Sequence, residues 1–311
     1  KPVAEMTGYD QSLRVTDVIE DQACDLVMEA SPVNLEHGDP GLTITRAALG
    51  NGISVVLANK APLVLAFQEL HELARDNDCE LGFSATVCGG LPVINIGRRD
   101  MVAADIELLR GIFNSTCNFI LDEMSTGRSY EDALAEAQRR GIAEADPSLD
   151  IDGWDSQHKI GILASLAHGF WVSPKRIHVE GIRHISKLDM QFAQQLGYTI
   201  KLLGIAKQIF ASKSQPKNSI QVSVYPTLIP NAHVLASVNG VFNACFVRGD
   251  VVGDTLFYGR GAGKDATASA VLSDVADAAL DFKLGAQVRV PPFVAHTRKG
   301  RVAPMAEITS R

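Results

Sequence analysis

Strand-like and helix-like segments alternate through the first 95 residues, and this alternation limits the possible folds more than any other feature of the sequence. Runs of apolar and β-branched residues at 24–31, 53–60 and 80–87 predict three strands. Between the second and third runs, residues 63–77 carry apolar side chains at helical spacing. Because strands that alternate with helices form βαβ units, the sequence predicts an α/β fold built on a parallel sheet.

Compared with a dinucleotide-binding sheet, this parallel sheet lacks its beginning. A dinucleotide-binding domain starts with a strand and a G-x-G-x-x-G turn, whose glycines let the backbone approach a pyrophosphate. No such turn precedes Cys24, and the nearest match, GRGAGKD at 259–265, lies towards the other end of the chain. Either the fold is not a dinucleotide-binding domain, or the chain is a fragment whose N-terminal strand is missing.

Residues 96–261 have a different pattern and predict a second domain of mixed α+β type. A helix is predicted at 130–140, and Ser129 begins it with a capping-box arrangement. Apolar strands follow at 198–210 and 218–229, and they are expected to pair as antiparallel neighbours. We expect this domain to form a homodimer, because its apolar strands exceed what one small core requires.

Composition and charge disfavour several classes of protein. The net charge is -7 and no long Lys/Arg run occurs, so nucleic-acid binding is disfavoured. The longest apolar run, 160–172, is too short to span a bilayer. The five cysteines are odd in number and never form a CxxC pair, which favours reduced thiols in the cytoplasm over disulfides or a zinc site.

Residues 141–159, GIAEADPSLDIDGWDSQHK, place five carboxylates ahead of Lys159. Asp155 and Lys159 are spaced i, i+4 in a predicted helix 154–168 and therefore share one face of it. One interpretation is a solvated acidic loop with a surface salt bridge worth under about 1 kcal/mol. The other is a site whose carboxylates bind a cationic amino group while Lys159 moves a proton. The spacing alone leaves both interpretations open. The apolar stripe of this helix is predicted at Ile160, Leu163, Ala164 and Ala167.

The same stretch resembles the homoserine dehydrogenase signature G-x-x-E-x-D-P…D-x-x-G-x-D-x-x-x-K. Further motifs of that family follow in order along the chain: LANKAPL (57–63), ATVCGGLPVI (85–94), GIFNSTCNFIL (111–121), EAQRRG (136–141), YTIKLLG and YGRGAGKDATASAVLSD. The resemblance extends from about Cys24 to Leu280. Several motifs in the right order are more specific than any one of them, and they favour the catalytic interpretation over the solvated loop.

The resemblance implies a two-domain, usually dimeric oxidoreductase. In this chain, residues 1–95 and 262–283 would form a partial NAD(P)-binding Rossmann-type domain with its N-terminal strand missing. Residues 96–261 would form the substrate-binding and dimerisation domain. Such enzymes reduce L-aspartate 4-semialdehyde to L-homoserine with NADPH or NADH, on the route to threonine, isoleucine and methionine. Lys159 is the implied proton donor to the aldehyde oxygen. Glu144 and Asp155 are implied to bind the substrate's amino and hydroxyl groups. Asp150 completes the acidic pocket, and Thr116 matches a position that faces the substrate.

The resemblance also implies residues for the cofactor, NADP or NAD, and for a cation. On the cofactor side they are Ser31, Lys60, Gly141 and Gly263. The segment SATVCGGLP matches a loop that relatives wrap around a monovalent cation, usually Na⁺, with main-chain carbonyls. Its implied ligands are Ser84, Val87, Gly89 and Leu91. Ser84 stands where relatives often carry an acidic residue, so a tight Gly-rich turn without an ion remains the alternative.

The end of the chain and two rival functions complete the sequence-based expectations. Residues 266–280 predict a strongly amphipathic helix, and 284–311 form a C-terminal tail whose last residues resemble the lead-in to an ACT domain in longer relatives. One rival is another semialdehyde dehydrogenase, the phosphorylating type, with Cys117 or Cys88 as a nucleophile. The second rival is a non-catalytic binding or scaffolding relative that lacks the cofactor loop.

Overall fold

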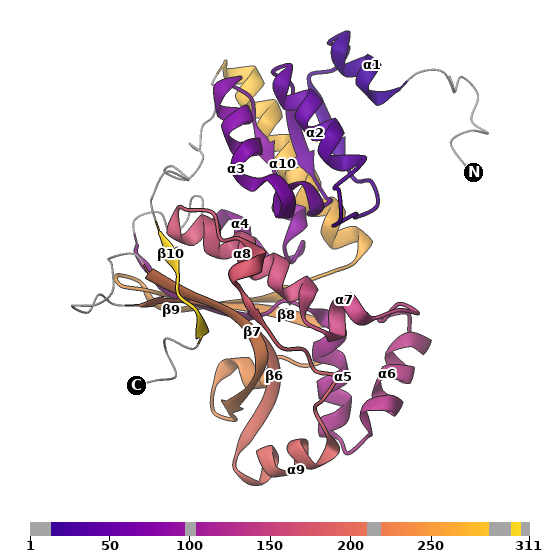
Figure 1. The fold of residues 1–311 in the computed structure, drawn as a ribbon, viewed down its shortest axis with the longest axis vertical. Coiled ribbons are helices and arrows are strands. Elements are labelled where there is room, and N and C mark those ends of the chain that lie inside the picture. Colours follow the sequence, from indigo (N-terminus) through magenta and orange to yellow (C-terminus); the bar gives the residue numbers. More distant parts are fainter. Residues whose placement is uncertain (1–13, 97–103, 210–218, 286–299, 306–311) are drawn as a thin grey trace. The chain divides into compact units, whose positions relative to one another are not determined.

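The computed structural model describes residues 14–96, 104–209, 219–285 and 300–305, which group into two compact units (Figure 1). The first unit comprises the described residues within 1–83 and 271–292, and the second those within 84–270 and 293–311. From the sequence, the boundaries between the two domains were predicted after residues 95 and 261. The first division therefore lies earlier in the chain than expected, and the second falls within a helix.

A three-stranded parallel sheet forms the centre of the first unit (Figure 1). The central strand is buried along its whole length, because a parallel sheet is covered on both faces. The predicted parallel sheet is therefore confirmed. The strands are β1 (Leu26–Glu29), β2 (Ser54–Leu57) and β3 (Leu81–Gly82), in the order β1-β2-β3. The helices are α1 (Val15–Glu20), α2 (Gly41–Gly50), α3 (Ala61–Asp76) and, in large part, α10 (Lys264–Leu284).

The third strand is shorter than the sequence predicted. It covers only Leu81–Gly82, and the 3₁₀ turn η2 (Ser84–Thr86) occupies much of the expected strand 80–87. The segment after Phe83 is rich in small residues and ends in two glycines, so it lacks the side chains that fill a sheet face. The chain therefore leaves the sheet early.

Helix α10 forms as predicted, but its inward face differs from an ordinary apolar stripe. Towards the first unit it buries Asp274, Ala278 and Asp281, while Leu272 and Phe282 are exposed. A Cβ atom built on Gly82 would lie 2.9 Å from the Asp274 Cβ, so helix and strand approach closely there. Such an approach leaves room for short side chains only, and the large apolar residues point outward.

A mixed sheet runs through the second unit (Figure 1). Its four longest neighbouring pairs are antiparallel, including the predicted hairpin β6–β7, whereas two short strands run parallel to β7. The α/β fold class with a second, mixed α+β part is thus confirmed. In sheet order the strands are β10 (Arg301–Val302), β7 (Ser219–Pro230), β6 (Tyr198–Ile209), β4 (Ile106–Ile112), β8 (Phe242–Gly249) and β9 (Gly253–Arg260), with β5 (His178–Val179) beside β7. The connection between β6 and β7, for which the sequence SKSQPKN at 212–218 predicts a polar turn, lies outside the described residues.

Helices of the second unit pack on this sheet and position the acidic stretch. Helix α8 contacts β4, β6 and β7, and α5 and α9 contact β6. Eleven of the 15 residues of α8 are buried, so the predicted four-residue apolar stripe was too narrow. The predicted cap of α6 is confirmed, since the Ser129 hydroxyl accepts from the Asp132 N–H at 3.1 Å. The elements are α4 (Val93–Asn95), α5 (Ser115–Ser125), α6 (Tyr130–Arg139), α7 (Ser148–Ile151), α8 (Trp154–His168), η4 (Pro174–Arg176), α9 (Lys187–Gln195) and η5 (Val234–Ser237).

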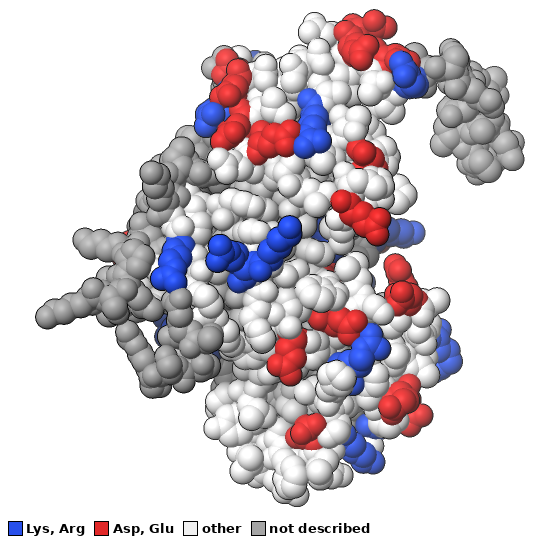
Figure 2. Space-filling model, in the orientation of Figure 1, with Lys and Arg blue, Asp and Glu red and all other residues white. Residues whose placement is uncertain are grey.

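Charged side chains of both signs are interspersed on the face that Figure 2 shows. Basic residues form no continuous field on this face, in agreement with the composition. Among the described helices, none has the length and apolar character needed to cross a bilayer.

Candidate active site

Lys159 and Asp155 form an ion pair that is largely withdrawn from solvent. The Lys159 Nζ lies 2.8 Å from the Asp155 Oδ2, and the two side chains are 15% and 9% exposed. The predicted i, i+4 contact is therefore confirmed, whereas the interpretation as a solvated surface pair is wrong. The Lys159 Nζ also donates to the main-chain oxygen of Phe113 at 2.8 Å. Strand β4 delivers that carbonyl, because it ends at Ile112 directly before it.

Asn114 joins the ion pair to a second carboxylate. Its Nδ2 donates to the Asp150 Oδ1 at 2.7 Å and to the Asp155 Oδ2 at 2.9 Å. Asp150 lies in the short helix α7. The sequence reasoning did not single out Asn114, although asparagine is among the residues that most often cap the start of a helix. No residue near Asn114 in the sequence indicated that the NH₂ group of its amide would face two carboxylates.

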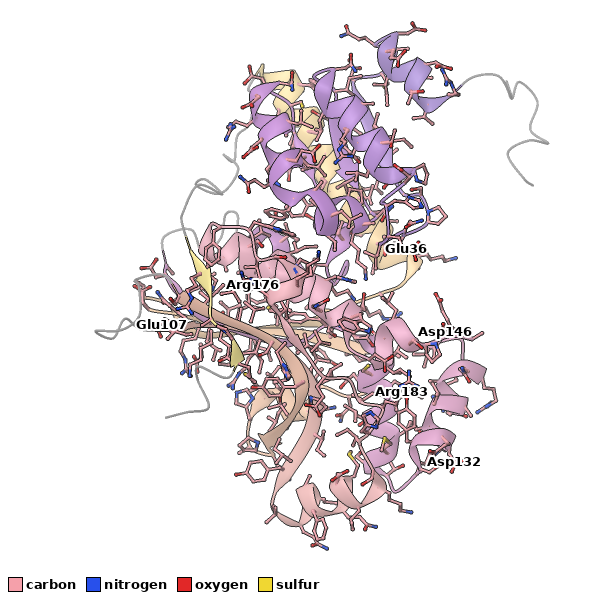
Figure 3. All side chains as sticks on the ribbon, in the orientation of Figure 1. Glu36, Glu107, Asp132, Asp146, Arg176 and Arg183 are labelled. Atoms are coloured by element: carbon pink, nitrogen blue, oxygen red, sulfur yellow. The ribbon has the colours of Figure 1, made fainter. Side chains whose placement is uncertain are left out.

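The remaining carboxylates of the acidic stretch do not share this arrangement. Asp152 forms a two-point ion pair with Arg183, at 2.9 and 3.0 Å. Asp146 is exposed, and hydrogen bonds from the side chain and the main-chain N–H of Ser148 lower the pKa of its carboxyl. Figure 3 shows Asp146 and Arg183 beside α7. Glu144 is exposed in the turn before them. Asp150 and Asp155 are thus the carboxylates placed beside Lys159.

The neighbours of Lys159 determine its charge. Burial by itself would lower the pKa of this amine, but the Asp155 carboxylate, with further contributions from Cys88 and Asp150, raises it above its ordinary value. At neutral pH the side chain is therefore an ammonium that donates hydrogen bonds. It is suited to neutralise or protonate an oxygen that becomes negative.

Two further residues of α5 border the acidic cluster. Thr116 is buried, and its hydroxyl donates to the carbonyl of Ile142 at 3.0 Å. The Cys117 thiol is buried and donates to the main-chain oxygen of Asp150 at 3.1 Å. Burial, reinforced by Asp150 and Asp155, raises the pKa of this thiol well above its usual range. Because the thiolate is the nucleophile, Cys117 is poorly suited to covalent catalysis.

Ser31 and Lys60 follow two neighbouring strands of the first unit at their carboxyl ends, where parallel sheets bind ligands. The Ser31 N–H donates to the Glu29 Oε1 at 2.8 Å, and its hydroxyl accepts from the Asn59 Nδ2 at 3.3 Å. Lys60 is buried and is the N-cap residue of α3. Glu29 and Asn59 were not singled out in the sequence, although both stand beside the residues that were.

Gly141 and Gly263 both have a positive φ, which favours glycine. Their φ angles are +67° and +123°, in the region that side chains disfavour. A Cβ atom built at either position would meet no atom within 4 Å. Gly263 directly precedes α10, and its carbonyl accepts from the Thr267 N–H at 2.9 Å. Both sites therefore have open space beside the backbone, which a bound molecule could approach.

The four candidate cation ligands lie in one tight segment. Ser84 begins the turn η2, Val87 and Leu91 are buried, and Cys88 has a positive φ of 50°. The Leu91 N–H donates back to the Cys88 carbonyl at 2.7 Å, while the Leu91 carbonyl accepts from the Val93 N–H. Among the described residues, no group of three or more His, Cys, Asp or Glu side chains is placed to hold a metal ion. Any cation in this segment would rely on main-chain oxygens.

Comparison with known proteins gives consistent matches along most of the chain. The family model described as homoserine dehydrogenase matches residues 92–276. The homoserine dehydrogenase of Pseudomonas aeruginosa is 43% identical over 245 residues, which is 78% of this chain and 55% of that protein. The Corynebacterium glutamicum enzyme is 48% identical over 237 residues, or 76% of this chain and 53% of that protein. The chain thus spans little more than half the length of these relatives.

Solved structures match as well. A homoserine dehydrogenase from Thiobacillus denitrificans has a TM-score of 0.86 and 40% identity, covering 94% of this chain and 66% of that one. A hyperthermophilic archaeal homoserine dehydrogenase in complex with NADPH has a TM-score of 0.75 and 30% identity. That match covers 90% of this chain and 79% of the archaeal one.

Proposed function

This chain belongs to the homoserine dehydrogenase family, and on that premise we propose that it carries the catalytic residues of an NAD(P)-dependent homoserine dehydrogenase. The proposed reaction is the reduction of L-aspartate 4-semialdehyde to L-homoserine. One observation carries the proposal: an ammonium group, Lys159, is largely buried beside two carboxylates that share a single asparagine amide.

Lys159 is proposed to supply a proton to the aldehyde oxygen as that oxygen becomes an alkoxide. An alkoxide is a far stronger base than an amine, so the transfer is favourable even from an ammonium whose pKa is raised. Asp155 holds the ammonium in place and, with Asp150, offers negative charge to the substrate's amino group. Glu144 and Thr116 are proposed to complete substrate binding.

A nicotinamide cofactor, NADP or NAD, supplies the hydride when bound. Gly141 and Gly263 fit such a group, because the open space beside both lets a dinucleotide approach the backbone. Ser31 and Lys60 are proposed to contact the cofactor from the carboxyl ends of β1 and β2. The archaeal structure in complex with NADPH supports a nicotinamide cofactor for the family.

A monovalent cation, Na⁺, is proposed at the carbonyls of Ser84, Val87, Gly89 and Leu91. The turn geometry supports this proposal, since η2 and the reversal at Cys88 gather successive carbonyls into a short segment. Hard cations prefer oxygen ligands of this kind. Replacing Na⁺ by a bulky organic cation at constant ionic strength should then lower activity or stability.

A homodimer in the cytoplasm is the proposed state of the protein. Leu256 and Tyr258 are exposed on β9, which forms an edge of the second sheet, and an edge strand with apolar side chains favours association. A monomeric mass by light scattering at micromolar concentration would contradict the dimer.

None of the five cysteines forms a disulfide, which supports the proposed cytoplasmic location because the cytoplasm is reducing.

The test of the proposed function is the substitution Lys159→Ala in the full-length protein. Turnover of L-homoserine with NADP⁺ should fall roughly 10²- to 10⁴-fold, the usual contribution of a general acid–base group. The melting temperature should also fall, because the buried Asp155 carboxylate and the Phe113 carbonyl lose their donor, so turnover is compared well below the melting temperature of the variant. A variant with near-normal turnover would end the assignment. Activity that instead requires phosphate and a cysteine would favour the phosphorylating rival.

A further inference from the structure

Asn114 is held in one orientation by the helix that it begins. It is the N-cap residue of α5, with extended backbone at φ -126° and ψ 117°, and its Oδ1 accepts from the Cys117 N–H at 2.8 Å. Because the helix end occupies the amide oxygen, the NH₂ group must point the other way. The identity of the two amide atoms is thus determined by the helix and does not depend on the acidic groups.

The NH₂ group of Asn114 faces two carboxylates at once. It lies 2.7 Å from the Asp150 Oδ1 and 2.9 Å from the Asp155 Oδ2, and the Asn114 side chain is buried. Two carboxylates at such close quarters repel each other. One N–H for each of them offsets this repulsion without adding a positive charge to compete with the substrate's ammonium.

The same short segment also contacts the lysine. The Phe113 carbonyl accepts from the Lys159 Nζ, and the next residue, Asn114, donates to the carboxylate oxygen that Lys159 contacts, the Asp155 Oδ2. One turn of the chain between β4 and α5 therefore touches both members of the ion pair. Any shift of Asn114 would move the carboxylate that keeps Lys159 charged.

We infer that Asn114 is a positioning residue: it fixes Asp150 and Asp155 beside Lys159 and thereby maintains the charge of the proton donor. This inference deepens the proposed function and rests on it for its catalytic consequence. The alternative is that Asn114 only caps α5. The two roles are separable, because an ionised aspartate caps a helix as well as asparagine does but cannot donate to a carboxylate.

The decisive experiment compares Asn114→Asp and Asn114→Leu in the full-length protein. In the ligand-free state, the pKa of Lys159 is measured by NMR from its side-chain resonances. Asn114→Asp adds a third carboxylate and should raise this pKa further. Asn114→Leu releases Asp155 from its anchor and should lower it, because burial then prevails. Turnover should fall at least about tenfold in both variants, since a misplaced catalytic group loses rate steeply.

Ser186→Ala is the matched control, because Ser186 caps α9 with a capping box and lies outside the acidic cluster. It should lower the melting temperature as a lost cap does, while the pKa of Lys159 and turnover stay unchanged. If the Asn114→Asp variant has the wild-type Lys159 pKa and turnover, Asn114 only caps α5 and the inference is wrong. If the wild-type protein lacks dehydrogenase activity, the proposed function fails, but the opposite pKa shifts still decide the positioning role.

Discussion

Lys159 and Lys201 are both withdrawn from solvent in the second unit, yet their surroundings differ in charge. Lys159 contacts the Asp155 carboxylate at 2.8 Å, and its pKa is raised. Lys201 is 1% exposed, and burial, opposed by Asp122, lowers its pKa to about 8. In the described parts of the chain no ion pair includes Lys201. The direction in which the pKa of a buried amine shifts thus depends on its charged neighbours more than on burial itself.

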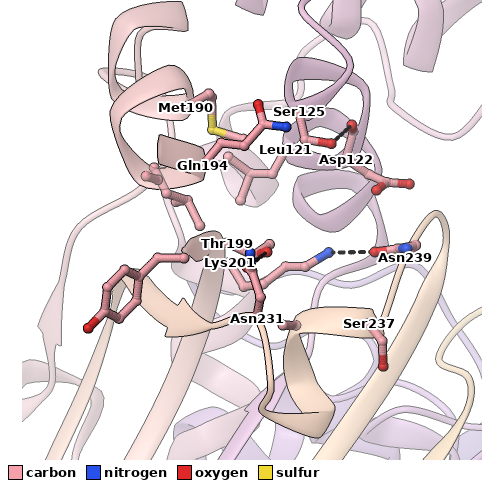
Figure 4. Close-up of a pocket in the computed structure, with 14 residues that line it drawn as sticks. Leu121, Asp122, Ser125, Met190, Gln194, Thr199, Lys201, Asn231, Ser237 and Asn239 are labelled. Carbon is pink, nitrogen blue, oxygen red and sulfur yellow. Dashed lines mark hydrogen bonds between the residues drawn. The ribbon is translucent and has the colours of Figure 1, made fainter. Parts of the chain in front are cut away.

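The contacts of Lys201 explain why it is structural rather than catalytic. Its Nζ donates to the Val238 carbonyl at 2.6 Å, the Asn118 Oδ1 at 3.0 Å and the Asn239 Oδ1 at 3.2 Å. Figure 4 shows the last of these bonds at the wall of a cavity of about 300 Å³. Three bonds use all three hydrogens of an ammonium, so none is left for a bound molecule. Lys201 therefore stabilises the loop at 238–239.

The largest expected effect comes from making Lys159 resemble Lys201. Asp155→Asn replaces the carboxylate by a neutral amide, so burial should prevail and the pKa of Lys159 should fall. Turnover should drop about 100-fold or more, and the KM for L-homoserine should rise, because substrate binding is lost together with the ammonium's partner. Steady-state kinetics measures both.

Asp152→Asn is the control for that variant, because Asp152 lies in the same acidic stretch but pairs with Arg183. A partly exposed ion pair contributes under about 1 kcal/mol, so turnover should change by no more than about twofold. Equal losses in the two variants would show that the acidic stretch acts through its overall charge, without a special role for the Lys159 pair.

Removal of the second amine should affect stability alone. Lys201→Met leaves the buried Val238 carbonyl and Asn118 Oδ1 without their donor, which should cost about 1–3 kcal/mol. Because the pKa of Lys201 is lowered to about 8 from 10.5, the unfolded chain binds more protons than the folded one between these pH values. Wild-type stability should therefore gain a contribution that grows as pH rises through this window, and the variant should lack it.

Urea unfolding at several pH values between about 7 and 10 tests this prediction. Lys207→Met is the control, because Lys207 lies on the same strand, β6, with an exposed side chain. That variant should keep the wild-type pH dependence. If Lys201→Met retains it too, the amine is not the group that titrates, and the contrast between the two lysines is lost.

The smallest effect should follow from making Lys201 resemble Lys159. Asn239→Asp places a carboxylate at an atom now 3.2 Å from the Lys201 Nζ, so the pKa of Lys201 should rise above about 8. Stability at neutral pH should increase by up to about 1 kcal/mol, because the Asn239 side chain is exposed and its new charge is well solvated.

NMR titration of the Lys201 side chain measures the shift. Asn231→Asp adds the same charge at the same cavity, but Asn231 contacts Thr199 rather than Lys201, and the shift should be smaller. Equal shifts in both variants would indicate a long-range charge effect without a direct pair.

Local spacing in the sequence determined several features of this protein. Alternating segments predicted the parallel sheet, Ser129 predicted the start of α6, and the i, i+4 spacing predicted the contact between Asp155 and Lys159. Such features need only a few neighbouring residues, whose geometry the helix or strand itself dictates. For the same reason the sequence could identify the acidic stretch as a candidate site.

Only the tertiary structure decided what that site contains. Asn114 lies 41 residues before Asp155, and packing of α5 against α7, with α5 and α8 both on strand β6, brings them within 2.9 Å. The same packing buries Lys159. It also brings Asp152 into an ion pair with Arg183 and Asp150 into a hydrogen bond with Asn114. Burial and long-range partners set the charge of each group, and they arise from contacts between distant segments that no local pattern encodes.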